Sequence, residues 1–341
     1  MTLTQLRYIV ALAREGHFGR AARACFVSQP TLSVAVRKFE DELELMLFER
    51  HSNHVAPTDA GRRVIAQAEK VLEEANRVQE LARAGRDQLK GELRIGAIFT
   101  VGPYVLPHVV PHLRELAPEM PLVIEENYTH RLGERLRRSE LDAVLLSLPY
   151  AEQGICTWPV YEEDFSVLLP ADHRLAKVET LQPGDLAGEN MLLLGDGHCF
   201  RDQVLAACPE CAPPVDTNRP ARTTEGSSLE TIGQMVASGL GVTVVPVTST
   251  DRWRDMRDQE RLIREKSFEG DPPRRTIAIA WRETFPRPRA IQALHRAVRA
   301  AGLDRVRYLE DAKPVDSDTG APLSGWLEAP GELTDPATSA G

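Results

Sequence analysis

The stretch Ala21-Ala-Arg-Ala-Cys-Phe-Val-Ser-Gln-Pro-Thr-Leu-Ser33 has the pattern of two helices joined by a tight turn. Its alanines would let another helix approach closely. The second helix would start at Ser28 or Gln29, and Pro30 falls in its first turn, where a missing backbone N–H breaks no helical bond. The buried side of this helix is predicted from apolar residues at helical spacing, Leu32, Val36, Phe39 and Leu43. The stretch therefore predicts a helix-turn-helix.

The flanking residues extend this unit to a winged helix-turn-helix over residues 1–60. Upstream, Thr2 and Gln5 have the spacing of a capping box at the start of a helix with an apolar face. Downstream, residues 51–57 have the pattern of a hairpin, which would be the wing. A small helical bundle that binds no ligand is the alternative.

Short polar side chains near the start of the second helix suit the reading of base edges in the major groove of DNA. The candidates on this helix are Gln29, Pro30, Thr31, Ser33, Val34 and Arg37. Arg50 and His54, at the predicted hairpin, are expected near DNA phosphates.

A long helix is expected over residues 58–90. Apolar and small residues alternate spacings of four and three, the rhythm of a coiled-coil seam, at Val64, Ala68, Val71, Ala75, Val78 and Ala82. Small residues in such a seam imply the close approach of a second helix, so the chain is predicted to be at least a homodimer. Gly85 and Gly91 would end the helix.

Residues 91–303 are predicted to form an α/β domain of two Rossmann-like subdomains with a cleft between them. The expected strands are residues 92–98, 122–128, 141–148, 165–169, 191–194, 242–245 and 276–281. Helical patterns separate them, and this alternation indicates parallel sheets. In such sheets ligands bind beyond the carboxyl ends of the strands. Polar clusters follow three of the strands, at Thr100, at Thr129-His130 and at Asp196-His198-Cys199-Asp202.

Cys199 and Cys208 lie nine positions apart on a stretch that is otherwise expected to be one short helix. Nine positions correspond to about 13 Å along a helix axis. A disulfide requires Cα atoms within about 7 Å of each other. A bond between these two sulfurs would therefore require the helix to unfold, as in a redox switch. Two buried structural cysteines are the alternative.

The surroundings of Cys199 predict the more reactive of the two thiols. With Asp196 as N-cap, Cys199 would lie in the first helical turn, where unpaired N–H groups and the helix dipole favour an anion. His198 and Arg201 flank it, and positive neighbours lower the pKa of a thiol. Cys208, at the other end of the helix, is expected to be less reactive.

The composition limits the class of protein. The chain has 341 residues, 42% of them hydrophobic, which implies two or three domains with substantial cores. It has no apolar run of transmembrane length and does not begin with a signal peptide, so a cytoplasmic protein with no membrane partner is expected. A net charge of −9 argues against a protein that coats nucleic acid, though not against a small DNA-reading module.

The other cysteines and the C-terminal segment carry less information. Five cysteines are too few for the disulfide framework of a secreted protein. Cys211 follows Cys208 without a second pair at ligand spacing, so no metal site is predicted. Cys25 is expected in the helix-turn-helix core and Cys156 in a connecting segment. Residues 304–341, rich in Pro, Gly, Ser and acidic residues, are predicted to be a disordered tail.

Several of these segments resemble the LysR-type transcriptional regulators. Residues 21–33, 43–50 and 57–61 are similar to that family's DNA-binding domain, and residues 172–176 and 228–246 to its effector domain. The resemblance covers residues 1 to about 303. It implies an effector domain like a periplasmic binding protein, in a homo-oligomer that is usually a dimer of dimers. It also implies a regulator, not an enzyme, that binds promoter DNA and RNA polymerase and needs no cofactor.

Within that family, residues 197–203 with Cys208, together with residues 100–107, resemble the members that sense hydrogen peroxide. This resemblance implies that Cys199 is oxidised first and that Cys208 then forms a disulfide with it, with Cys211 as a competing partner. It further implies a set of residues that bind peroxide or support the thiolate, Thr100, Thr129, His198, Asp202 and Arg275. Arg274 competes with Arg275 for its role. Reductants of the glutaredoxin or thioredoxin type would reverse the oxidation.

Two other functions stay open. One is a LysR-type regulator that responds to a small organic effector in the cleft between the subdomains, with incidental cysteines. The other is a thiol peroxidase that carries the DNA-binding domain of a relative. A peroxide-responsive activator of oxidative-stress genes is the main prediction.

Overall fold

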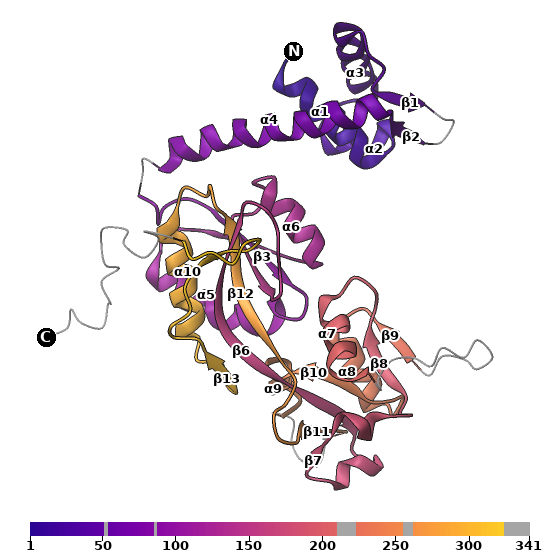
Figure 1. Ribbon diagram of the computed structural model, residues 1–341, viewed down its shortest axis with the longest axis vertical. Helices are drawn as coiled ribbons and strands as arrows, with labels where there is room; N and C mark the ends of the chain where they lie inside the picture. Colours follow the sequence, from indigo (N-terminus) through magenta and orange to yellow (C-terminus); the bar gives the residue numbers. More distant parts are fainter. Residues whose placement is uncertain (51–53, 85–86, 210–222, 255–261, 324–341) are drawn as a thin grey trace, which may run out of the picture. The chain divides into compact units, whose positions relative to one another are not determined.

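The computed structural model describes residues 1–50, 54–84, 87–209, 223–254 and 262–323 (Figure 1). The chain divides into two compact units, Met1–Gly85 and Arg86–Gly341. Each unit has hydrophobic core clusters of its own. Among the helices in these ranges, none has both the length and the apolar character needed to cross a membrane.

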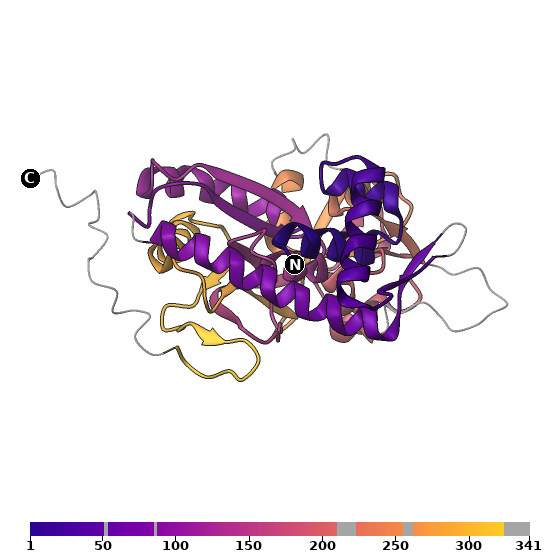
Figure 2. The ribbon, with the colours of Figure 1, turned by 90° about the horizontal axis from the view of Figure 1, so that it is seen from above.

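The N-terminal unit is a winged helix-turn-helix followed by one long helix. Its elements are α1 (Leu3–Glu15), α2 (Phe18–Ala24), α3 (Gln29–Leu43), the wing strands β1 (Phe48–Arg50) and β2 (Val55–Pro57), and α4 (Asp59–Ala84). The predicted capping box of Thr2 and Gln5 is confirmed. The structure adds a cap at the start of α3, where the Ser28 hydroxyl accepts from the Thr31 N–H at 3.3 Å. Figures 1 and 2 show α4 as a single unbroken helix.

The end of α3 differs from the predicted apolar stripe. Leu43 is 38% exposed, whereas Glu40 is only 4% exposed. The Glu40 carboxylate accepts hydrogen bonds from the backbone N–H groups of Leu47 and Phe48, at 2.9 and 3.2 Å. These bonds satisfy the buried charge and join α3 to the wing.

The junction between the wing and α4 explains a segment that the sequence singles out, residues 57–61. The Thr58 hydroxyl donates to the Met46 carbonyl at 2.9 Å and accepts from the Gly61 N–H at 2.9 Å, which caps α4. A side chain at Gly61 would overlap the carbonyl oxygen of Leu47. Glycine is therefore required for α4 to pack against this loop.

The C-terminal unit contains two α/β subdomains, as predicted. In the first, β3 (Leu93–Ile98) lies parallel between β4 (Leu122–Asn127) and β5 (Ala143–Ser147), and the sheet continues through β12 (Arg274–Arg282) to β6 (Ile155–Pro170). The helices of this subdomain are α5 (Gly102–Leu116), α6 (Thr129–Arg137) and α10 (Pro288–Ala300).

The second subdomain is built around a short parallel pair, β8 (Met191–Leu194) with β9 (Thr223–Gly226). Strands β10 (Thr243–Pro246) and β11 (Ile263–Phe268) pair with β6, and β7 (Thr180–Leu181) pairs with β11. Its helices are α7 (Cys199–Ala207), α8 (Leu229–Ala237) and α9 (Asp251–Arg254), with short 3-10 turns η1 (Arg174–Lys177), η2 (Pro183–Leu186) and η4 (Val247–Ser249).

Strand β6 connects the two subdomains. Its first half pairs with β12, and its second half pairs with β10 and β11. The prediction of a strand only at 165–169 was too short, and Cys156, expected in a connecting segment, is a fully buried residue of β6. The expectation of parallel sheets is confirmed for β3 with β4 and β5 and for β8 with β9, but β12, β10 and β11 run antiparallel to β6.

The prediction of a disordered tail is wrong for residues 304–323. Strands β13 (Val306–Tyr308) and β14 (Val315–Asp316) both pair with β6, and the Trp158 indole N–H donates to the Ala312 carbonyl at 2.9 Å. Backbone pairing of this kind orders a segment whose composition alone predicts disorder. Residues 324–341 lie outside the described part of the chain.

A buried histidine of α10 gives a stability prediction. His295 is 6% exposed and stacks on Trp158 with ring centroids 3.8 Å apart. Burial, with a smaller contribution from Arg299, lowers the pKa of His295 to about 4. Since the unfolded chain takes up this proton near pH 6.5, the folded state loses stability as the pH falls from about 6.5 to about 4.

Between pH 7 and pH 5 the loss from this group is expected to be about 2 kcal/mol. Urea unfolding of the effector domain at both pH values measures it. In the His295→Gln variant the drop between the two pH values should shrink by that amount. An equal drop in both proteins would show that other groups cause the pH dependence.

Candidate functional site

A small pocket lies where three segments of the C-terminal unit meet. Its walls come from the end of β3, from the β4–α6 junction and from the start of α7, with Ile98, Phe99, Thr100, Asn127, Tyr128, Thr129, Gly197, His198, Cys199 and Phe200 as lining residues. Members of all three predicted polar clusters, Thr100, Thr129, His198 and Cys199, thus lie together, whereas His130, Asp196 and Asp202 are not among the lining residues. The cavity volume is about 10 Å³, which is close to the space that a single water molecule needs.

Cys199 is the first residue of α7 and is partly buried. The predicted N-cap was wrong: His198 occupies the N-cap position, and Asp196 lies two residues earlier with an exposed side chain. Gly197 has φ +93°, a left-handed conformation that favours glycine. Helix α6 also begins at the pocket, with Thr129. The first residues of two helices therefore line the pocket, and helix N-termini favour anionic ligands.

His198 does not supply the positive charge that the sequence suggested. It is 6% exposed and packs against the rings of Phe99 and Tyr128, with centroids 5.6 and 4.8 Å away. Burial lowers its pKa below the ordinary value of 6.5, so the ring is neutral at pH 7. Arg201, the other predicted neighbour, donates to the Leu194 carbonyl at 2.8 Å and pairs with Asp196 at 3.4 Å.

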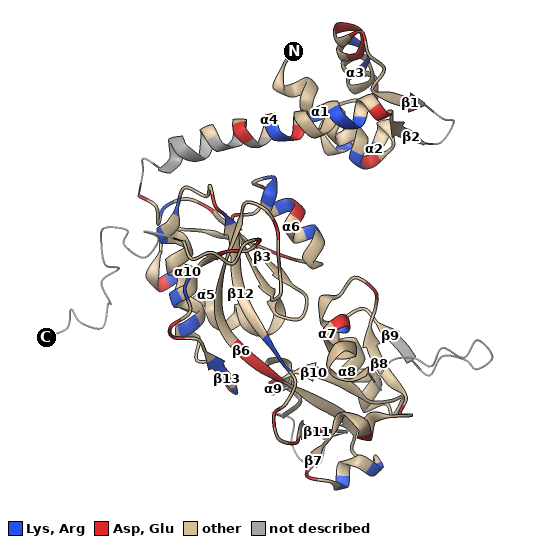
Figure 3. Cartoon of the chain, viewed as in Figure 1, with Lys and Arg blue, Asp and Glu red and all other residues tan. Residues whose placement is uncertain are grey.

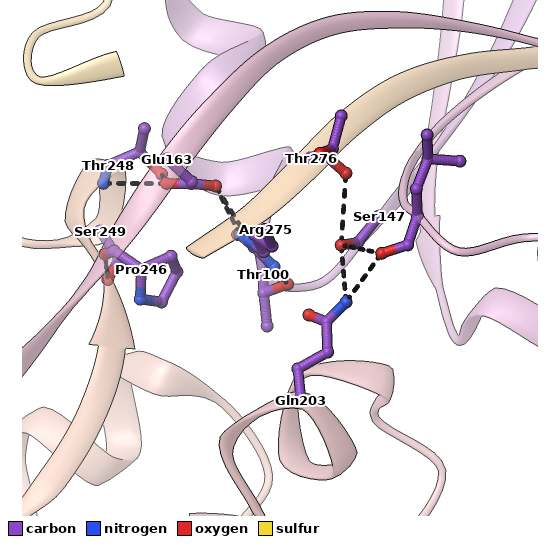
Figure 4. Close-up of polar contacts among 10 residues, drawn as sticks. Thr100, Ser147, Glu163, Gln203, Pro246, Thr248, Ser249, Arg275 and Thr276 are labelled. Carbon is purple, nitrogen blue, oxygen red and sulfur yellow. Dashed lines mark hydrogen bonds and ion pairs between the residues drawn. The ribbon is translucent and has the colours of Figure 1, made fainter. Parts of the chain in front are cut away.

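Thr100 is held by a buried arginine (Figure 4). The Nη1 group of Arg275 donates to the Thr100 hydroxyl at 2.7 Å, and Nη2 donates to the Thr100 carbonyl at 2.8 Å. Of the two adjacent arginines that the sequence left competing, Arg275 is the one at the pocket wall. Arg274 is at the surface, where it pairs with Asp164 and Asp271.

The ion-pair partner of Arg275 is Glu163, a residue that the sequence did not single out. Arg275 Nε donates to the Glu163 carboxylate at 2.9 Å, and both side chains are 0% exposed. Figure 3 shows the acidic part of β6 beside the basic start of β12 at this point. The cross-strand pairing of Glu163 with Arg275 places these two charges side by side.

The structure places Thr129 at the pocket and Asp202 away from it. The Thr129 hydroxyl oxygen is buried and has no hydrogen-bond partner within the described residues, so it is available to a ligand. Asp202 is exposed on α7 and is absent from the pocket lining. On the next position of the helix, the Gln203 amide donates to the Ser147 hydroxyl at 2.8 Å and to the Leu148 carbonyl at 3.2 Å, which anchors α7 to the end of β5 (Figure 4).

Cys208 lies at the other end of α7 from Cys199. It is the C-cap residue, is 0% exposed and belongs to the core of the second subdomain. Both residues are thiols in this structure. With α7 intact between them, the two Cα atoms are separated by about 13 Å along the helix axis. Cys211 lies outside the described residues.

The N-terminal unit presents a second candidate site, on α3. The predicted DNA-reading residues lie in its first half, and Gln29, Pro30, Thr31, Val34 and Arg37 are exposed, while Ser33 is partly buried. Pro30, Ser33, Val34 and Arg37 share one face because they recur at helical spacing. His54 is exposed just before β2. Arg50 is the last residue of β1, and its side chain lies outside what the structure describes.

Comparison with known families agrees with this architecture. Residues 3–62 match the bacterial regulatory helix-turn-helix of the lysR family, and residues 86–302 match the LysR substrate binding domain. The chain is 39% identical over 302 residues to the DNA-binding transcriptional dual regulator OxyR of Escherichia coli K12, which covers 88% of this chain and 95% of the relative.

The chain belongs to the OxyR group of LysR-type transcriptional regulators.

Other OxyR-type relatives also align with most of the chain. A probable hydrogen peroxide-inducible genes activator of Streptomyces viridosporus is 37% identical over 311 residues, covering 91% of this chain and 97% of the relative. A solved full-length OxyR mutant from Pseudomonas aeruginosa is 49% identical, covers 91% of this chain and 98% of that chain, and has a TM-score of 0.69. A hydrogen-peroxide-bound OxyR mutant from Corynebacterium glutamicum is 32% identical, covers 88% and 92%, and has a TM-score of 0.57.

Membership of this family confirms the predicted fold class and the prediction of a DNA-binding transcription regulator. Among the described residues, no group of three or more His, Cys, Asp or Glu could hold a metal ion. The roles of the individual site residues stay predictions.

Proposed function

We propose that this chain is a transcription regulator that senses hydrogen peroxide through oxidation of Cys199. The observation that carries the proposal is the pocket at the start of α7, which combines a cysteine at a helix start with a cavity of about 10 Å³. A cavity of this size suits a molecule not much larger than water. The OxyR relatives named as hydrogen peroxide-inducible genes activators support the same oxidant.

The reaction begins with attack of the Cys199 thiolate on one oxygen of the peroxide. A sulfur–oxygen bond forms, the O–O bond breaks, and sulfur loses two electrons to give a sulfenic acid and hydroxide. Thr129, whose hydroxyl has no partner among the described residues, and Thr100, which also lines the pocket, are proposed to bind the two oxygens. The neutral His198 covers the pocket with apolar contacts. Asp202 would reach the site only after α7 changes conformation.

The sulfenic acid is then resolved by a second thiol, which condenses with it and releases water. Cys208 is the proposed partner, and Cys211 remains the competitor. Because α7 holds Cys199 and Cys208 about 13 Å apart, the disulfide forms only after this helix unwinds. Unwinding must also withdraw Cys208, and with it part of the second subdomain's core.

The refolded segment is proposed to change how the homo-oligomer, a dimer of dimers, presents its paired helix-turn-helix units to promoter DNA. RNA polymerase would be the partner recruited by the oxidised form at oxidative-stress genes. Dithiol reductants of the glutaredoxin or thioredoxin type would restore the two thiols by exchange. This cycle requires a reducing compartment such as the cytoplasm.

A small organic effector is the competing function. Pockets for such ligands usually have volumes of several hundred Å³, far more than the cavity beside Cys199. A thiol peroxidase would need repeated turnover with a reductant, whereas a regulator needs only one oxidation per chain.

A DNA footprint of the pure full-length protein tests the proposal. With an equimolar amount of hydrogen peroxide and no reductant, the protected region should change, and excess dithiol should restore the original footprint. The control is the same protein alkylated at Cys199 before peroxide is added. A footprint that ignores peroxide but responds to an organic compound would favour the competing function.

The anchor of α7 gives a prediction for the rate of resolution. The Gln203→Ala variant loses the two hydrogen bonds to the end of β5, so α7 should unwind more easily. We expect disulfide formation after sulfenic acid formation to accelerate by about fivefold to thirtyfold, since two hydrogen bonds contribute about 1–2 kcal/mol. Rapid quenching and mass analysis measure it. The Ser147→Ala variant removes the acceptor of one of these two hydrogen bonds and should also accelerate disulfide formation. Unchanged rates in both would show that α7 unwinding does not limit resolution.

A further inference from the structure

We propose that Glu163 is a positioning residue of the peroxide pocket: through Arg275, it directs the hydroxyl hydrogen of Thr100 toward the bound peroxide. This inference rests on the proposed function and adds a residue to it. Glu163 is neither a pocket-lining residue nor near Cys199 in sequence, and it acts through the arginine that contacts Thr100.

Glu163 is held as an ionised carboxylate. One oxygen accepts from Arg275 Nε at 2.9 Å and lies 2.8 Å from Nη2. The other accepts from the Thr248 N–H at 3.2 Å and from the Thr248 hydroxyl at 2.7 Å (Figure 4). All four groups can act as donors to the carboxylate, which is the pattern of an acceptor-only, charged group. Four contacts in a fully buried site leave the carboxylate a single orientation.

The carboxylate in turn fixes the guanidinium. Nε and Nη2 face Glu163, while Nη1 and Nη2 reach Thr100, so the planar group has one arrangement that satisfies both sides. The ring of Phe200, next to Cys199 in the chain, lies 5.0 Å from the Arg275 Cζ atom. Because both side chains are buried, separating them would leave a charge without a partner in the protein interior, and this is energetically costly. The pair is therefore held in this arrangement.

The fixed guanidinium determines where the Thr100 proton points. Since Arg275 Nη1 donates to the hydroxyl oxygen at 2.7 Å, the oxygen acts as an acceptor on that side. A hydroxyl has one hydrogen, and that hydrogen cannot point at a guanidinium. Thr100 lines the pocket, so its hydrogen is left to donate to a pocket ligand.

This orientation matters in the step that breaks the O–O bond. As the Cys199 thiolate forms its bond to one oxygen, negative charge develops on the departing oxygen. The Thr100 hydroxyl donates a hydrogen bond to that oxygen and keeps its own proton. The hydroxide that leaves takes a proton from solvent and becomes water. A preorganised donor aimed at developing charge commonly contributes about 10²–10³-fold to a rate.

The Glu163→Gln variant tests this role with little change in volume. The NH₂ group of the glutamine amide is a hydrogen-bond donor, and it would have to face either the donors of Thr248 or those of Arg275. The hydrogen bonds that orient Arg275 therefore cannot all persist. We expect the rate constant of Cys199 oxidation by hydrogen peroxide to fall by about 100-fold. Glu162→Gln is the matched control, because the neighbouring carboxylate pairs near the surface with Arg307 and should leave the rate within about twofold.

Two small reagents separate positioning from general damage to the pocket. Iodoacetamide and methyl methanethiosulfonate both need the Cys199 thiolate, but their leaving groups, iodide and methanesulfinate, need no hydrogen bond from Thr100. We expect both rates in Glu163→Gln to stay within about threefold of the wild type. If Glu163→Gln does not fold, Thr248→Val, which removes one donor to Glu163, should slow the peroxide reaction alone by about threefold to tenfold.

Three outcomes overturn the inference: an unchanged peroxide rate in the folded variant, an equal fall with all three reagents, or an equal fall in Glu162→Gln. The first leaves the proposed function intact, since wild-type Cys199 would still react with peroxide. Wild-type protein that peroxide does not oxidise at Cys199 would instead overturn the proposed function.

Discussion

The Cys199→Ser variant is expected to lose the whole response to peroxide while it binds promoter DNA as the reduced wild type does. A serine hydroxyl fits the space of the thiol but is not ionised at neutral pH and does not attack peroxide. Two of the remaining cysteines, Cys25 and Cys156, are poor substitutes. Burial raises the pKa of Cys156 to about 12 and also raises that of Cys25, and only the thiolate is nucleophilic.

Footprints of Cys199→Ser with and without peroxide should be identical to each other and to that of the reduced wild type. The rate constant of thiol oxidation should fall by at least about 10³-fold. Cys156→Ser is a matched control, a buried thiol outside the pocket that should leave both measurements unchanged. A footprint of Cys199→Ser that still shifts with peroxide would place the sensor elsewhere in the chain.

The Cys208→Ser variant is expected to stop the cycle at the sulfenic acid. Cys199 should be oxidised at the wild-type rate, because Cys208 lies at the far end of α7 and contributes nothing to the pocket. Without the second sulfur no disulfide forms, α7 stays helical and the footprint should not change. Excess peroxide should then carry Cys199 to the sulfinic acid.

Dimedone labelling followed by mass analysis measures the trapped sulfenic acid of Cys208→Ser. Cys211→Ser is the companion variant, and it should form the disulfide and shift the footprint normally. If Cys208→Ser keeps the wild-type response and Cys211→Ser loses it, the resolving role belongs to Cys211. A normal response in both would mean that sulfenic acid alone changes the footprint.

Much of the fold could be predicted from the sequence because it depends on local patterns. The capping box at Thr2, the start of α3 at Gln29 and the strand ends at Thr100 and Thr129 are each encoded within a few residues. The sequence-based predictions failed where the structure depends on contacts between segments that are distant in the chain. The extent of β6 and the order of residues 304–323 depend on pairing with strands far away in the chain, which composition and periodicity do not reveal.

The candidate site shows the same division. The pattern around Cys199 predicted a helix start, but the cap shifted from Asp196 to His198 because the chain turns at Gly197 in a left-handed conformation. Glu163 lies in a run of three acidic residues, 162–164, that has the appearance of a charged surface. Only the register between β6 and β12 shows which of the three is buried against Arg275.

In the proposed cycle, oxidation joins two sulfurs that α7 keeps apart. Disulfide mapping by mass spectrometry tests this step in the full-length protein after one equivalent of peroxide, under conditions that block exchange. The predicted result is one dominant cross-link, between Cys199 and Cys208, absent before oxidation. A Cys199 that remains a thiol, or a dominant disulfide that does not include it, would contradict the account.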